Sequence, residues 1–492
     1  MKREYFRLDG DTLSLPAPPN TVGRIIEAAV YFFLALVFAV LACSLLNLVF
    51  EGYVYILAML AALILAVWLI VRFSHREKRV LLVLLILSAA LRAAVIMLVP
   101  TQPVSDFSQL FEAAQATAAG DLSWSHVTQG YFSWWQYQIP FVLYEALVYK
   151  LVPSMAVLKL LNLVWSVGVN YFLYRLAARF LPKRCALIAA FLYAVHPGQI
   201  ALVPVLTNQH ISMFFMLFGL TVLFEAKSWK GFALSGALLA VGNLMRPEAV
   251  ILIAALGCLC LCSFIQQPGK RRLMQLLAAL AAVGLAYFAV QKAAEWILYA
   301  LDIAPYGLGN SVPEWKLVVG LNTQTGGSLT MMDLDALYIT DPIERHEACM
   351  EIVKGYIDTC ADLPAFFFGK FIDFWKNGED FSFALGGINA WETTRLGLTY
   401  ERLFAMLGGI ETAERFFAYG LTAAGCVMLG LGAAKRRSRR VAGLPLIIAA
   451  ILCGIVLVYL IIEIQPRYRY IAMPFIFIMA SVPFAANIKN GK

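Results

Sequence analysis

The fold is decided by VLLVLLILSAALRAAVIMLV, residues 80–99, and by the PTQPVSDFSQLF that follows at 100–111. The first part is apolar over about 20 residues, the length that crosses the ~30 Å hydrocarbon core of a bilayer. The second part places the carboxylate of Asp106 where such a helix would emerge into water. The segment therefore predicts a membrane-spanning helix with an acidic group at its outer end.

The rest of the chain repeats this apolar pattern. Apolar residues make up 61% of the 492 residues and charged residues 14%, whereas soluble domains have about 45–50% and about 25%. The sequence therefore predicts an all-α integral membrane protein with about twelve transmembrane helices. These lie near 26–50, 53–72, 80–99, 154–174, 185–204, 210–226, 231–245, 248–265, 274–299, 416–434, 442–461 and 470–486.

The net charge of +8 is explained by short basic loops. Basic residues cluster in alternate loops, which is typical of the cytoplasmic side of a membrane protein. We therefore predict a multi-pass protein of the cell membrane with both termini in the cytoplasm, bound to the lipid bilayer and to no nucleic acid. The basic loops read MKREYFR at 1–7, RFSHREKR at 72–79, AARFLPKR at 177–184, GKRR at 269–272 and KRRSRR at 435–440.

The same topology divides the chain into four parts. Residues 1–79 form the cytoplasmic N-terminus and a transmembrane hairpin, and 80–299 form a transmembrane module with a first outer loop at 100–153. Residues 300–415 form an extracytoplasmic loop domain, because they are too long for a plain connector. Residues 416–492 hold the C-terminal transmembrane helices. Within the outer domain, 341–377 predicts two helices broken at Pro364.

The residues after Asp106 predict a short helix along the membrane surface. Phe107, Leu110, Phe111 and Ala114 recur at helical spacing. Asp106 together with Gln109 matches a capping box, so a purely structural role for this carboxylate is one interpretation. A catalytic role is the other.

The segment GYFSWWQYQIPFVLYEALVYKL, residues 130–151, is dense in aromatic side chains. Such residues form belts at membrane interfaces. They also suit a groove that holds a lipid chain or a sugar ring. The candidate groove residues are Tyr131, Trp134, Trp135 and Tyr137.

Several ionisable residues lie in or beside apolar spans. Each costs roughly 2.5–3.5 kcal/mol near a bilayer centre on insertion scales, so such residues are usually paired, line a cavity or serve a function. Snorkelling to headgroups is the structural alternative. Because most of them fall on the same side as Asp106, we interpret them as one site. They are Arg92, Arg246 and Glu248 in NLMRPEAV, and Glu463, Arg467 and Arg469 in IIEIQPRYRYIAMPF.

Five motifs resemble the GT-C superfamily of glycosyltransferases, in particular its polyprenyl-phosphate-sugar-dependent members such as protein O-mannosyltransferases and aminoarabinose transferases. The order and sidedness of the motifs carry the resemblance, which covers most of residues 80–486. The motifs are PVSDFSQL at 103–110, YQIPFVLYEALVYKL at 137–151, LKLLNLVWS at 158–166, LMRPEAVILI at 244–253 and EIQPRYRYIAMP at 463–474.

The resemblance implies a GT-C-like helix bundle and a membrane glycosyltransferase. The donor would be a polyprenyl-phosphate sugar, and the acceptor an extracytoplasmic hydroxyl of a surface glycan, lipid or protein. Asp106 matches the family's catalytic base, and the reaction would invert the anomeric carbon. Arg467, Arg469 and Arg246 are the expected ligands of the donor phosphate, with Glu463 in the substrate groove.

The sequence departs from this pattern in the next outer loop, HPGQIALVPVLTNQHIS at 196–212. Many relatives carry a second acidic residue there, but this chain has Asn208 and Gln209. Neutral amides are poor substitutes for carboxylates at a divalent cation. We therefore expect no cofactor and assign no metal ligand, although His196 and His210 remain alternative ligands for a divalent metal.

A polytopic transporter or lipid flippase is the alternative from another functional class. Transporters often contain inverted repeats and broken helices near the midplane. The sequence shows no clear internal repeat, and its spans are unevenly spaced around a large outer loop. These features favour the glycosyltransferase.

Overall fold

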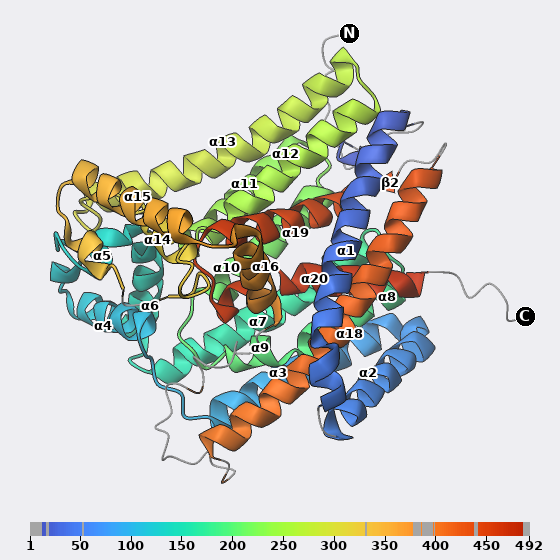
Figure 1. The fold of residues 1–492 in the computed structure, drawn as a ribbon, viewed down its shortest axis with the longest axis horizontal. Helices are drawn as coiled ribbons and strands as arrows, with labels where there is room; N and C mark the ends of the chain where they lie inside the picture. Colours follow the sequence, from blue (N-terminus) through green and yellow to red (C-terminus); the bar gives the residue numbers. More distant parts are fainter. Residues whose placement is uncertain are drawn as a thin grey trace, which may run out of the picture.

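The structure is a computed structural model that describes residues 12–15, 19–51, 54–329, 332–376, 385, 397, 399–436 and 441–485. Helices make up most of the described chain, as the sequence predicts (Figure 1). A short antiparallel pair of strands, β1 (Ser14–Leu15) and β2 (Val441–Ala442), joins the segments that precede α1 and α19.

The α-helices of the described chain are α1 (Thr21–Glu51), α2 (Val54–Phe73), α3 (Glu77–Leu98), α4 (Asp106–Ala119), α5 (Tyr131–Trp134), α6 (Ile139–Leu151), α7 (Met155–Ala178), α8 (Lys183–Val195), α9 (Pro197–Ala201), α10 (Gln209–Glu225), α11 (Trp229–Met245), α12 (Ala249–Gln266), α13 (Lys270–Ala300), α14 (Trp315–Gly320), α15 (Pro342–Thr359), α16 (Leu363–Lys376), α18 (Tyr400–Lys435), α19 (Leu444–Ile461) and α20 (Met473–Ser481). The 3-10 helices are η2 (Ser74–Arg76), η3 (Ser123–Ser125), η4 (Gln136–Gln138), η5 (Leu334–Tyr338), η6 (Pro466–Ile471) and η7 (Val482–Ala485).

Seven helical segments of the described chain are long and apolar enough to cross a membrane. They are Thr21–Val49, Ile56–Leu98, Met155–Ala178, Ala249–Gln266, Lys270–Ala300, Glu401–Lys435 and Leu444–Ile461. Two shorter apolar segments are Gln209–Glu225 and Met473–Ala485. These segments agree with a multi-pass membrane protein, whereas the predicted number of about twelve spans is not confirmed.

The long helices pack side by side. Helices α1 and α18 cross the right of Figure 1 in contact with each other, and α11 lies between α10 and α13. The α11–α13 contact is so close that a Cβ atom at Gly236 would lie 2.1 Å from the carbonyl oxygen of Val283. Glycine is therefore required at this crossing, because any larger side chain would separate the helices.

The helix expected over 185–204 is interrupted, because α8 ends at Val195 and α9 starts at Pro197. Proline has no N–H, so it cannot donate to the carbonyl of Tyr193. The Arg92 guanidinium instead donates to the carbonyls of Tyr193 (3.3 Å) and Ala194 (3.1 Å). Arg92 is fully buried. The position of Arg92 inside a predicted span therefore has a structural explanation: its guanidinium provides hydrogen bonds to carbonyls at the end of α8.

The first outer segment and the beginning of the second lie together at the left of Figure 1, where α4, α5 and α6 meet α14 and α15. Backbone hydrogen bonds join them: Tyr137 N–H donates to Gly309 O (3.2 Å), and Ser311 N–H donates to Trp134 O (2.9 Å). The two helices predicted within 341–377 are confirmed as α15 and α16. The break, however, lies at 360–362, and Pro364 falls in the first turn of α16, where a proline is tolerated.

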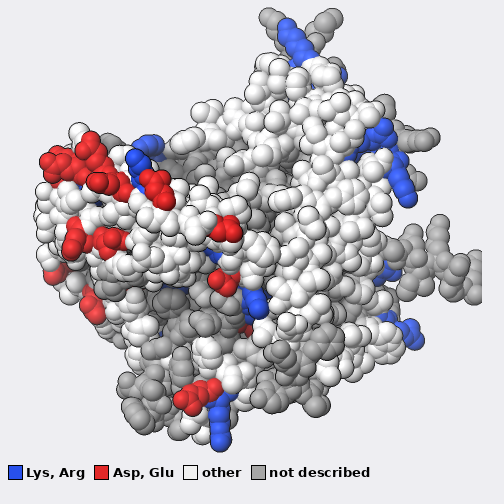
Figure 2. Space-filling model, in the orientation of Figure 1, with Lys and Arg blue, Asp and Glu red and all other residues white. Residues whose placement is uncertain are grey.

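Charges are unevenly distributed over the surface in Figure 2. Acidic groups gather at the left, where α15 exposes Glu344, Glu347 and Glu351, and most basic groups lie at the top and right. The left edge holds the segments predicted to be extracytoplasmic. This distribution is the one expected from basic cytoplasmic loops, and the orientation of the termini remains a prediction.

Candidate active site

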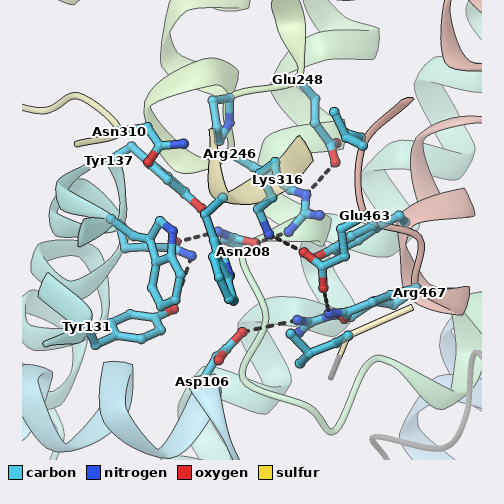
Figure 3. Close-up of a pocket in the computed structure, with 18 of the residues that line it drawn as sticks. Asp106, Tyr131, Tyr137, Asn208, Arg246, Glu248, Asn310, Lys316, Glu463 and Arg467 are labelled. Atoms are coloured by element: carbon cyan, nitrogen blue, oxygen red, sulfur yellow. Dashed lines mark hydrogen bonds and ion pairs between the residues drawn. The ribbon is translucent and has the colours of Figure 1, made fainter. Parts of the chain in front are cut away.

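A cavity of about 440 Å³ lies where the outer segments meet the connectors α11–α12 and α19–α20 (Figure 3). Its volume is within the range of small-molecule sites. Besides five aliphatic side chains, it is lined by charged, neutral polar and aromatic ones. The charged ones are Asp106, Arg246, Glu248, Lys316, Glu463 and Arg467; the neutral polar ones are Gln138, Asn208, Asn310 and Gln465; the aromatic ones are Phe107, Tyr131, Trp135, Tyr137, Trp315, Tyr459 and Tyr468.

Asp106 is the first residue of α4 and does not cap it. Ser105 occupies the N-cap position, with φ 53°, and no side chain makes a capping hydrogen bond there. The capping-box interpretation of Asp106 and Gln109 is therefore wrong. The Asp106 carboxylate instead accepts a hydrogen bond from Arg467 Nη2 at 3.1 Å, and its side chain remains 38% exposed to the cavity.

The helix that carries Asp106 is anchored by the predicted apolar face. Phe107, Leu110, Phe111 and Ala114 are all buried, which confirms the helical spacing read from the sequence. The Phe107 ring also lies 4.9 Å from the Arg467 guanidinium carbon, a cation–π contact. The same turn of α4 therefore carries both the carboxylate that contacts Arg467 and the aromatic ring that packs against its guanidinium.

Three cations line the cavity, and each is paired with a carboxylate. Arg467 contacts Asp106, Arg246 Nε lies 2.5 Å from Glu248 Oε1, and Lys316 Nζ contacts Glu463 Oε2. Lys316 comes from α14 and was missed by the sequence analysis. Nothing in EWKLVV distinguishes this lysine from other lysines of the outer segments, since only folding brings α14 beside Glu463.

The Lys316–Glu463 pair is held in its charged form. Burial opposes the charge on Lys316, but the neighbouring Tyr468 and Glu463 outweigh it and raise the pKa of the ammonium. Burial likewise opposes the charge on Glu463, but Lys316 lowers the pKa of its carboxyl. The Glu463 side chain is only 2% exposed, so its charge depends on this partner.

Backbone contacts fix α14 against the connector that follows α19. Glu463 N–H donates to Lys316 O (3.1 Å), and Ile464 N–H donates to Gly327 O (2.9 Å). Lys370 Nζ donates to Ile462 O (2.8 Å) and also to Gly320 O. The outer segment is thus attached to the residues that carry Glu463 and Arg467, which fixes Lys316 in the cavity wall.

The aromatic candidates divide between two environments. Tyr131, Trp135 and Tyr137 line the cavity, where Figure 3 shows Tyr131 and Tyr137 across from Glu463 and Arg467. Trp134 is not among the lining residues, and its ring packs against Tyr338 of the outer segment, 5.3 Å between centroids. Glu463 lines the cavity, as predicted for a groove residue, but on its charged side.

Arg469 lies away from the cavity, unlike Arg246 and Arg467. It is fully buried and donates to the carbonyl of Phe374 at 2.8 Å. Arg467 and Arg469 are two residues apart in η6, so their side chains leave the chain in different directions. The structure therefore brings Asp106, Arg246 and Arg467 together and leaves Arg469 in the protein interior.

The two amides and two histidines of the loop 196–212 do not fit a divalent cation. Asn208 Oδ1 accepts from Arg246 Nη1 (3.3 Å), and Gln209 Nε2 donates to Arg467 O (2.6 Å). His196 Nδ1 contacts Glu414 (2.8 Å), and His210 Nδ1 contacts the Tyr470 hydroxyl (2.6 Å). No group of three or more His, Cys, Asp or Glu among the described residues is placed to hold a metal ion.

Comparison with known proteins adds two findings. Residues 141–292 match a family model described as dolichyl-phosphate-mannose-protein mannosyltransferase. The apo crystal structure of the Archaeoglobus fulgidus oligosaccharyltransferase is similar over 82% of this chain, with 13% sequence identity and a TM-score of 0.43. The chain spans half (50%) of the length of that protein. A search of curated proteins finds no match.

Proposed function

We propose that this chain transfers a sugar from a polyprenyl-phosphate-linked donor. The family match over residues 141–292 supports both the relationship to GT-C glycosyltransferases and the predicted enzyme class. The acceptor is a hydroxyl on the extracytoplasmic side of the membrane. One observation carries the proposal. The carboxylate of Asp106 meets the guanidinium of Arg467 in a cavity that holds two further cations, Arg246 and Lys316.

The reaction uses Asp106 as general base. An acceptor hydroxyl has a pKa far above 7, so a positioned carboxylate must take its proton as the new C1–O bond forms. The bond between C1 and the phosphate oxygen breaks, and its electron pair leaves with that oxygen. The products are the glycosylated acceptor and a polyprenyl phosphate. In-line attack opposite the leaving oxygen inverts the anomeric carbon.

The cations stabilise the leaving phosphate. Arg467 is the central one, because it already contacts the base. When Asp106 accepts the proton it loses its negative charge, and at the same time charge grows on the leaving oxygen. The attraction of Arg467 therefore moves from the carboxylate to the phosphate during the reaction. Fixed cations that meet developing charge are the usual source of such stabilisation.

Arg246 and Lys316 complete this phosphate site in the proposal. The Lys316–Glu463 and Arg246–Glu248 pairs hold each cation in place before the donor arrives. Tyr131, Trp135 and Tyr137 form the opposite wall and would contact the sugar or the first part of the lipid. Arg469 supports η6 through Phe374 rather than meeting the donor.

The donor type is tested directly with purified protein in detergent or vesicles. We expect transfer from a polyprenyl-phosphate sugar and none from a nucleotide sugar. A βαβ nucleotide-binding unit needs about 30 residues or more, and the predicted cytoplasmic loops are shorter. Turnover with the nucleotide sugar but not with the lipid-linked form would overturn the proposal, and the absence of turnover with both would favour a transporter.

A further inference from the structure

Two of the ion pairs in the cavity are joined through one neutral side chain, that of Gln465. Its Oε1 accepts a hydrogen bond from Arg467 Nε at 2.8 Å, and its Nε2 donates to Glu463 Oε1. Together with the Asp106–Arg467 and Lys316–Glu463 contacts, this makes a continuous chain of polar contacts from α4 to α14. Figure 3 shows Asp106, Arg467, Glu463 and Lys316 along this path.

An amide suits this position because its two neighbours have opposite requirements. A guanidinium can only donate hydrogen bonds, and a carboxylate can only accept them. A glutamine offers an acceptor oxygen to Arg467 and a donor nitrogen to Glu463, so the neighbours determine its orientation. A carboxylate here would place like charges together at Glu463, and an aliphatic side chain would remove the hydrogen bonds to both neighbours.

The backbone on both sides of Gln465 is fixed independently. Gln465 itself is extended, with φ −141° and ψ 145°, and Ile464 forms an isolated parallel bridge with Ser328. The carbonyl of Arg467 accepts from Gln209 Nε2 at 2.6 Å. These contacts place the Cα atoms of Glu463 and Arg467, but they do not set the plane of the Arg467 guanidinium.

The Gln465 side chain adds that constraint, together with the Phe107 ring that packs against the guanidinium. A guanidinium is a rigid planar fork, so a contact at Nε fixes the direction in which the Nη atoms point. With Nε held by Gln465, Nη2 reaches Asp106. We propose that Gln465 is a positioning residue that orients Arg467 toward Asp106 and the donor phosphate, and that it ties this orientation to the Lys316–Glu463 pair of the outer segment. This inference rests on the proposed function.

The test compares two substitutions of Gln465 in the full-length protein, supplied with a polyprenyl-phosphate sugar. Gln465→Leu removes both hydrogen bonds, and we expect kcat to fall about 10- to 100-fold, as is typical when the partner that orients a functional group is lost. We expect the donor KM to change much less, since Arg246 and Lys316 remain. Gln115→Leu is the matched control, because Gln115 is an α4 amide that donates to Tyr149 and does not line the cavity.

Gln465→Glu gives a readout that a merely structural role would not produce. When the introduced glutamate is ionised, it still accepts the hydrogen bond from Arg467 but turns an oxygen, instead of a donor, toward Glu463. When it is protonated, its O–H can again donate to Glu463. The activity of this variant relative to wild type at the same pH should therefore rise as the pH is lowered from about 8 to about 6, because the nearby Glu463 favours the protonated form.

Three outcomes would show whether Gln465 positions Arg467. Wild-type kcat and KM in Gln465→Leu, or a pH-independent activity ratio in Gln465→Glu, would overturn the positioning role while leaving the proposed function intact. A Gln465→Leu variant that does not fold leaves the Gln465→Glu ratio to decide. An inactive wild-type protein with every lipid-linked donor would instead overturn the proposed function, and this inference with it.

Discussion

The Asp106 carboxylate lies 3.1 Å from the Arg467 guanidinium, although the two residues are 361 positions apart in the chain. Asp106 starts the first outer helix, and Arg467 lies in the connector before α20. Their contact places a carboxylate beside a guanidinium, which are the proton acceptor and the phosphate-binding cation of the proposed reaction. The predictions below test this arrangement and the membrane topology around it.

Asp106→Asn should abolish most transfer and leave the fold intact. Asparagine keeps the size of the side chain but cannot take a proton at neutral pH, so kcat should fall by ~10²–10⁴. The midpoint of thermal unfolding should change little, because Asp106 makes no capping hydrogen bond, its side chain is 38% exposed, and the amide oxygen of asparagine can still accept the hydrogen bond from Arg467. Initial rates and thermal unfolding measure the two effects. An Asn variant with wild-type activity would rule out Asp106 as the base.

Arg467 and Arg469 should respond differently to substitution. Arg467→Lys keeps the charge but cannot contact both Gln465 and Asp106 through a planar fork, so donor affinity and kcat should both fall. Arg469→Lys should chiefly lower thermal stability, because Arg469 is fully buried against the carbonyl of Phe374. Binding of polyprenyl phosphate and thermal unfolding separate these effects. If Arg469→Lys weakened polyprenyl-phosphate binding as much as Arg467→Lys and left stability unchanged, Arg469 would have to be assigned to the phosphate site.

The Lys316–Glu463 pair should make stability depend on pH. Lys316→Met leaves the nearly buried carboxylate of Glu463 without its partner, and we expect a loss of about 3 kcal/mol, as for other broken buried pairs. In the wild type the pKa of Glu463 is lowered, so the stability from its charge is present above about pH 4.5 and is lost as the pH falls through the lowered value. In the variant the effect of Lys316 is lost, so burial raises the pKa of Glu463 against only the Gln465 hydrogen bond and the Arg467 charge.

The difference in unfolding temperature between wild type and Lys316→Met should therefore be largest at neutral and alkaline pH and shrink toward about pH 4. Glu463→Gln combined with Lys316→Met should recover part of the lost stability, because no buried charge then remains unpaired. Thermal unfolding over a series of pH values measures both effects. A difference that stays constant down to acidic pH would show that the pair contributes no charge-dependent stability.

Reporter fusions test the orientation of the chain. A fusion after Arg440 should report the cytoplasm, because it follows the basic loop KRRSRR. A fusion near Asp333 should report the extracytoplasmic side, because Asp333 lies in the outer segment 300–415. Paired activity reporters for each compartment give the measurement. If both fusions reported the same side, the assignment of the cavity to the outer side of the membrane would be wrong.

The sequence by itself determined the environment of the chain and the identity of several local elements. Long apolar runs give helices whatever their neighbours, because backbone polar groups in lipid must be satisfied within the segment. The spacing of Phe107, Leu110, Phe111 and Ala114 likewise fixed the buried face of α4. The sequence also singled out Asp106, Arg246 and Arg467, because charged residues beside apolar spans are costly and stand out.

Tertiary structure decided which of these charges meet and what each one does. Arg92, Arg467 and Arg469 look alike in the sequence, yet Arg92 completes the end of α8, Arg469 donates to Phe374, and Arg467 reaches Asp106. Lys316 and Gln465 entered the site only because α14 packs on the connector after α19. The direction of a side chain and the contact between distant segments depend on packing that no local pattern encodes, so these residues could be found only in the folded chain.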